Sequence, residues 1–100
     1  MGLVIVGAGG HGRCCLDIAR EIYDDIVFLD DALAGTIVND CKVIGRVDDM
    51  QALYSMYSDV FIAVGNNQLR LKLINQAKKI GFNIINLISC LLYTSDAADE

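Results

Sequence analysis

The stretch Leu3-Val4-Ile5-Val6-Gly7-Ala8-Gly9-Gly10-His11-Gly12 decides the fold of this chain. Its first four residues form an uninterrupted aliphatic run, which is typical of a central parallel strand covered on both faces. Gly7, Gly9 and Gly12 follow with the G-x-G-x-x-G spacing, and a helical pattern begins directly afterwards. Such glycines bring backbone N–H groups and a helix N-terminus close to a phosphate. The stretch therefore predicts a phosphate-binding turn, but many folds share this spacing, so the ligand depends on the rest of the chain.

A helix is predicted from about Gly10 to Tyr23, because its apolar residues fall on one face and its charged residues on the other. Cys14 and Cys15 lie on the apolar face, where we interpret them as small buried hydrophobic side chains. A nucleophilic cysteine beside His11 stays open as the alternative. The four cysteines form no C-x-x-C pair, and with a single histidine they predict no metal site.

Two acidic residues, Asp30 and Asp31, follow the second predicted strand, residues 26–29. An acidic side chain roughly 20 residues beyond a glycine turn, at the tip of the next strand, can accept hydrogen bonds from a ribose or a base. A solvent-exposed turn explains the pair equally well. Both interpretations stay open on spacing alone, and both residues are candidate substrate-binding residues.

The segment after the acidic pair, residues 32–42, is predicted to be irregular because it contains several turn-forming residues. A short edge strand is predicted at 43–45. Asp48 is then expected to cap a short helix that ends near Met56.

A third buried strand, residues 59–64, ends in Gly65-Asn66-Asn67. Ligands of open α/β sheets collect outside the carboxyl ends of the strands, so Gly65 and Asn66 join the candidate substrate-binding residues. A tight turn at Gly65 and a helix cap at Asn66 or Asn67 explain the same residues without a ligand. Both interpretations can hold together.

The order of the elements predicts an α/β fold, a Rossmann-like and mainly parallel sheet of four to five strands with helices on both faces. The strand at 2–6 is expected between those at 26–29 and 59–64, with a strand at 82–88 outside the latter. The helix over 68–80 is expected to bury one stripe of side chains, made of Leu69, Leu73, Ala77 and Ile80.

Length and composition point to a single domain of 100 residues with an aliphatic core, since 54% of them are hydrophobic and only 7% aromatic. The formal charge of −5 argues against a general nucleic-acid surface, but not against a phosphate held by backbone dipoles. No run reaches the ~18 apolar residues of a membrane span, and no signal-peptide pattern opens the chain. We therefore expect a cytoplasmic protein without nucleic-acid or membrane partners.

Five motifs carry a family resemblance, namely Val6–Gly12, Phe28–Asp31, Ala63–Asn67, Gly81-Phe82 and Asn86–Ile88. In this order and spacing they resemble the N-terminal domain of the sugar O- and N-acyltransferases related to sialic acid O-acetyltransferase and the UDP-4-amino-sugar (bacillosamine-pathway) N-acetyltransferase. The resemblance covers about residues 1–89. The G-H-G ending of the turn makes it more specific than the glycine spacing alone.

The resemblance implies a substrate-binding domain cut off from its catalytic partner. In that family the N-terminal domain holds the nucleotide-sugar, and a C-terminal left-handed β-helix trimerises, binds acetyl-CoA and carries the catalytic histidine. Here Ser89 stands where the family continues into a His-containing segment and hexapeptide repeats. The expected domains are therefore 1–89, which binds nucleotide-sugar, and a non-native-looking frayed tail, 90–100. We expect the intact enzyme to be a homotrimer, and the fragment to be inactive alone and monomeric.

The resemblance also assigns the candidate site residues to parts of a UDP-sugar. It implies Gly9, Gly10 and His11 at the phosphates and sugar, the acidic pair 30–31 at the uridine, and Gly65 near the pyrophosphate. For His11, a residue that only shapes the turn is the alternative.

Two other functions stay open. The first is an NAD(P)-binding Rossmann domain of an oxidoreductase, with Asp30 on the adenosine ribose; no residue for hydride transfer is identified in the sequence. The second is a non-catalytic nucleotide-binding module, which would account for the small size without truncation.

Overall fold

The computed structural model describes residues 2–85, without the side chains of residues 10–15. The predicted tail, the domain boundary at residue 89 and the end of the last predicted strand lie outside these residues, and so does the choice between the two interpretations of Cys14 and Cys15. The elements follow one another as β1 (Gly2–Val6), α1 (Gly10–Ile22), β2 (Asp25–Leu29), β3 (Ile37–Val38), β4 (Cys41–Gly45), η1 (Val47–Asp49), α2 (Met50–Leu53), β5 (Asp59–Ile62), α3 (Asn67–Ile80) and β6 (Asn83–Ile84).

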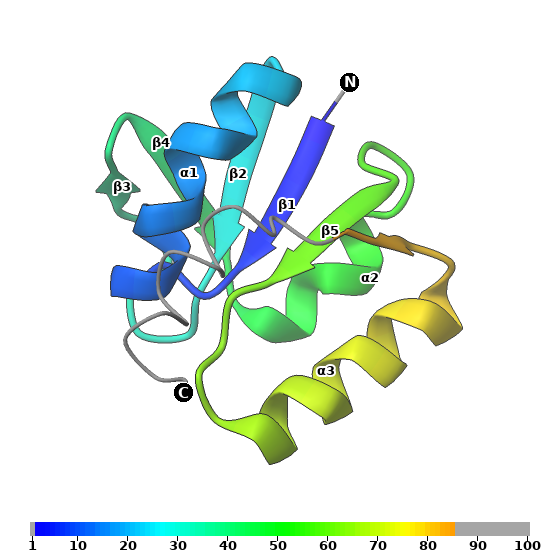
Figure 1. The fold of residues 1–100 in the computed structure, drawn as a ribbon. Helices are drawn as coiled ribbons and strands as arrows, with labels where there is room; N and C mark the ends of the chain where they lie inside the picture. The colour runs from blue at the N-terminus through cyan, green and yellow to red at the C-terminus, as the bar shows by residue number, and fades with distance from the viewer. Residues whose placement is uncertain (1, 86–100) are drawn as a thin grey trace.

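The strands form one six-stranded sheet in the order β3-β4-β2-β1-β5-β6 (Figure 1). All neighbouring strands are parallel except β3 and β4, which are antiparallel. The predicted α/β class and the predicted order, with β1 between β2 and β5 and the last strand outside β5, are confirmed. Residues 2–85 contain six strands where four to five were expected, because β3 was not predicted.

The strand predicted at 43–45 is present as part of β4, but β3 pairs with its outer side, so its predicted place at the edge of the sheet is wrong. Residues 37–45 form a hairpin whose two linking residues, Asn39 and Asp40, have φ angles of 49° and 70°. Positive φ at both central positions is what a two-residue hairpin turn requires, and Asn and Asp tolerate it better than most residues. The segment predicted to be irregular, residues 32–42, therefore contains an edge strand.

Helices cover both faces of the sheet, as predicted. The side chains of β1 alternate between two hydrophobic clusters, and those of residues 3–6 are fully buried. Leu16 and Ala19 of α1 belong to the cluster on one face, whereas α2 and α3 contribute to the cluster on the other. Because β1 is buried on both sides, it needs a continuous aliphatic run rather than an alternating one.

On the second face, the short helix and α3 differ in detail from the sequence prediction. The short helix begins as the 3₁₀ turn η1, and its cap comes from Asp49 rather than Asp48, because the Asp49 Oδ2 accepts the Arg46 N–H at 2.9 Å. Its α-helical part ends at Leu53 rather than near Met56. In α3, Leu73 and Ala77 are buried as expected, but Leu69 is 45% exposed.

No helix within residues 2–85 combines the length and the apolar character needed to cross a membrane.

Tyrosine–aspartate pairs stabilise the sheet at the amino-terminal ends of β2 and β5. The Tyr23 hydroxyl donates to Asp59 Oδ2 at 2.7 Å, and the Tyr57 hydroxyl donates to Asp25 Oδ2 at 3.1 Å. Burial, the hydrogen bond to Asp59 and its negative charge raise the pKa of Tyr23 to about 12. The same causes, with Asp25 as partner, raise the pKa of Tyr57.

Replacing Tyr23 by Phe is expected to flatten the loss of stability at high pH. A tyrosine ionises near pH ~10 in the unfolded chain, so its folded-state stabilisation is complete below that pH and is lost as the pH rises toward 12. Urea unfolding between pH 7 and 12 measures this, with Tyr54→Phe at a 45% exposed position as the control. Identical pH profiles of the two variants would contradict the assignment.

Candidate functional site

The glycine turn after β1 is fixed to both neighbouring strands. Gly7 N–H donates to the Leu29 carbonyl at 2.7 Å, and the Val6 carbonyl accepts Ala63 N–H at 2.8 Å. Gly7 has a φ of +103°, and a Cβ added there would lie 2.7 Å from the Ala63 carbonyl oxygen. The fold itself therefore requires glycine at position 7.

Gly9 differs from Gly7 because the fold does not need it. A Cβ added to Gly9 would meet nothing within 4 Å, and the residue is exposed. Gly9 is the N-cap of the 13-residue helix α1 and provides no side-chain cap. The N–H groups of a first helical turn carry a partial positive charge, so this end of α1 is a suitable place for an anion.

Asp30 ties the glycine turn to the end of β2. Its Oδ2 accepts Ala8 N–H at 2.9 Å, and its Oδ1 accepts Ala32 N–H at 2.8 Å and Leu33 N–H at 3.1 Å. Burial by itself raises the pKa of the Asp30 carboxyl, but the three hydrogen bonds outweigh it and hold the pKa below its ordinary value. Asp30 is therefore ionised at neutral pH and organises the backbone on which a ligand would lie.

Asp31 connects the carboxyl end of β2 to the start of η1. Its Oδ1 accepts Val47 N–H at 2.9 Å, which fixes the start of η1 beside the carboxyl end of β2. Within residues 2–85, the second oxygen, Oδ2, accepts no hydrogen bond. Within the acidic pair, the local turn bonds are therefore those of Asp30 to Ala32 and Leu33, whereas Asp31 joins segments far apart in the sequence.

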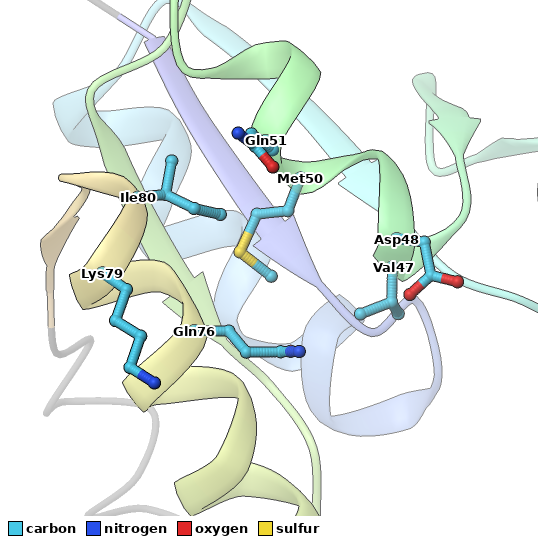
Figure 2. Close-up of a pocket in the computed structure, with 7 residues that line it drawn as sticks. All are labelled: Val47, Asp48, Met50, Gln51, Gln76, Lys79 and Ile80. Atoms are coloured by element: carbon cyan, nitrogen blue, oxygen red, sulfur yellow. The ribbon is translucent and has the colours of Figure 1, made fainter.

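A cavity of about 330 Å³ opens where β1, β2 and β5 end, on the face covered by α2 and α3. A second cavity of about 220 Å³ lies between η1, α2 and α3 (Figure 2). The two share Val47, Asp48 and Gln76, so they are adjacent and are described together as one groove. We call it the α2–α3 groove; its other lining residues are Val6, Gly7, Asp30, Asp31, Met50, Gln51, Val64, Leu69, Lys72, Leu73, Lys79 and Ile80.

Charge is unevenly distributed along this groove. Three acidic residues, Asp30, Asp31 and Asp48, are among the described residues that line the larger cavity, together with one basic residue, Lys72. A diphosphate placed among these carboxylates would be repelled, whereas ribose hydroxyls and base N–H groups can donate to them. The groove is therefore chemically suited to a nucleoside, and the start of α1 to its phosphates.

Only part of the predicted site is brought together. Gly7 and the acidic pair 30–31 line the groove. Gly65 and Asn66 line neither of its cavities, and the Asn66 Oδ1 accepts Leu69 N–H at 2.9 Å, which makes it the cap of α3.

The remaining predicted residues lie at the N-terminus of α1. Gly10, His11 and Gly12 form its first turn, next to Gly9. Their role as substrate contacts, like that of Gly65, stays a prediction.

Sequence reasoning missed the contribution of α3 and η1. Lys72 and Gln76 lie three and seven residues after Leu69, on one helical face, and all three line the groove. This spacing was the available signal. The sequence analysis instead predicts that Leu69 belongs to a buried stripe with Leu73, Ala77 and Ile80, and it assigns no substrate-binding residue to this helix.

Comparison with known proteins places these features in a family. Residues 2–77 match the PglD N-terminal domain. A mutant of perosamine N-acetyltransferase from Caulobacter crescentus, solved with CoA and GDP-perosamine, shares the fold with a TM-score of 0.77 and 29% identity, over 87% of this chain and 42% of that one. The acetyltransferase domain of PglB from Neisseria gonorrhoeae, solved with acetyl coenzyme A, gives 0.73 and 38% over 81% and 40%.

The chain thus spans less than half the length of these acetyltransferases. They confirm the resemblance to sugar acetyltransferases, and they do not favour the oxidoreductase alternative. Since the family profile matches most of its length, the chain belongs to the PglD N-terminal domain family.

Proposed function

We propose that this chain is the nucleotide-sugar-binding part of an acetyl-CoA-dependent sugar N- or O-acetyltransferase. The observation that carries the proposal is the α2–α3 groove, which is lined by Gly7 of the glycine turn that leads into α1. The similar enzyme from Caulobacter crescentus was solved with GDP-perosamine, a nucleotide-sugar. A nucleotide-sugar contains a nucleoside, which suits the groove, and a diphosphate, which suits the start of α1.

The diphosphate would lie over Gly9, where no side chain intervenes between the ligand and the N–H groups that begin α1. The nucleoside would enter the groove, whose carboxylates accept hydrogen bonds from its hydroxyl and N–H groups. This orientation directs the sugar away from the groove, toward the side on which His11 follows the turn.

The chemistry of transfer would take place outside the described residues. In the intact enzyme, the sugar's amine or hydroxyl would attack the thioester of acetyl-CoA while a base, expected to be a histidine, removes its proton. The role proposed for this chain is to hold and orient the nucleotide-sugar for that attack. Alone it is expected to bind and not to catalyse.

Isothermal titration of the 100-residue chain with UDP, GDP and NAD tests the proposal. We expect a nucleoside diphosphate to bind and NAD not to bind. Gly9→Ala should weaken the nucleotide by roughly tenfold, since a methyl group would stand where the phosphates approach, and should leave the melting temperature unchanged because that direction is empty. Binding of NAD without either diphosphate would contradict the proposal.

A further inference from the structure

The junction of the two cavities in the α2–α3 groove is lined by Val47, Asp48 and Gln76. Figure 2 shows the Gln76 side chain extending from α3 toward η1, which carries Val47 and Asp48. The junction therefore combines an apolar surface, an acceptor-only carboxylate and an amide that can both donate and accept. These are the three kinds of group that recognise the face and the edge of a nucleobase.

The backbone that leads into Asp48 is fixed at the start of η1. Val47 N–H is held by Asp31, and Arg46 N–H is held by Asp49. Asp48 is exposed and lines both cavities. A carboxylate on an anchored turn can discriminate between ligands, because little conformational freedom remains to be lost on binding.

A carboxylate discriminates between the two bases that are relevant here. Guanine presents two adjacent donors, N1–H and the N2 amino group, next to the acceptor O6. Uracil presents one donor, N3–H, between two carbonyl oxygens that a carboxylate repels. A bidentate, charge-assisted pair is therefore available to guanine alone.

Resting on the proposed function, we propose that Asp48 is a specificity-determining residue that makes this chain prefer guanine over uracil nucleotides. Asp48 accepts from N1–H and the N2 amino group, Gln76 donates to O6, and the base face lies on Val47. This preference differs from the uridine nucleotide that the sequence resemblance implies, so measured affinities decide between the two bases.

Titration calorimetry with GDP and UDP separately, on the 100-residue chain, tests the proposal. The wild type should bind GDP at least about tenfold more tightly than UDP, as expected for hydrogen bonds to a charged group. Asp48→Asn should remove most of this preference by weakening GDP and leaving UDP unchanged or improved. Asp17→Asn, the same charge change at an exposed position of α1, is the matched control and should behave like the wild type.

Each outcome separates this proposal from the proposed function. Equal affinity for both nucleotides, tighter binding of UDP, or an Asp48→Asn variant with an unchanged ratio would overturn the specificity and leave nucleotide-sugar binding intact. Failure of the folded chain to bind either nucleotide would overturn both.

Discussion

Gly7→Ala should lower the free energy of unfolding by about 3 kcal/mol. Two costs add at this position. The φ of +103° is unfavourable for a residue with a side chain, and the new methyl group would lie 2.7 Å from the Ala63 carbonyl oxygen. Since that oxygen belongs to the segment that follows β5, the strain would separate β1 from β5 at the edge where the groove opens.

Urea unfolding followed by circular dichroism measures this loss. Gly9→Ala is the matched control, because it is the same substitution two residues away, in a direction without any contact within 4 Å. Gly9→Ala is expected to unfold at the wild-type urea concentration. If the two variants were equally stable, the distinction between a glycine needed by the fold and one facing the ligand would be wrong.

Asp30→Ala is expected to destabilise the chain by on the order of 3 kcal/mol, because three backbone N–H groups lose their acceptor at once. Ala8 lies in the glycine turn and the other two donors follow β2, so the substitution also disorganises the surface proposed for the ligand. We therefore expect nucleotide affinity to fall together with stability.

The pH dependence of the free energy of unfolding distinguishes the loss of the Asp30 carboxylate from the loss of side-chain volume. The pKa of Asp30 is lowered in the folded state, so its stabilisation is complete above the ordinary pKa of ~3.9 and is lost as the pH falls through the lower folded-state value. Asp30→Asn should lack this part of the acid-induced loss. Asp17→Asn serves as control, and an acid transition of Asp30→Asn that matches the wild type would contradict the assignment.

Most of the sheet could be predicted because its signals are local. The aliphatic run at 3–6 and the glycine turn after it placed β1 at the centre, and the buried strands at 26–29 and 59–64 followed with their correct neighbours. The β3–β4 hairpin could not be predicted in the same way. Its turn depends on the left-handed conformation of two residues whose side chains are equally common in irregular loops.

The site could be predicted only where the sequence places its residues at strand ends. Gly7 and the acidic pair 30–31 were found for this reason. Lys72 and Gln76 were not, since they reach the groove only because α3 packs beside β5, β6 and α2. Asn66 shows the opposite case, a polar residue at a strand tip whose side chain is used by its own helix.

An amide chemical-shift titration of the isotopically labelled 100-residue chain with GDP and UDP tests the central claim most directly. We predict that the changes concentrate at the carboxyl ends of the strands, on Ala8, Gly9 and Val47, and along the groove-facing side of α3. The opposite edge, formed by the amino-terminal ends of the strands and carrying Tyr23 and Asp59, should be unaffected. Changes confined to that opposite edge, or no saturable change with either nucleotide, would contradict a nucleotide-sugar site in the α2–α3 groove.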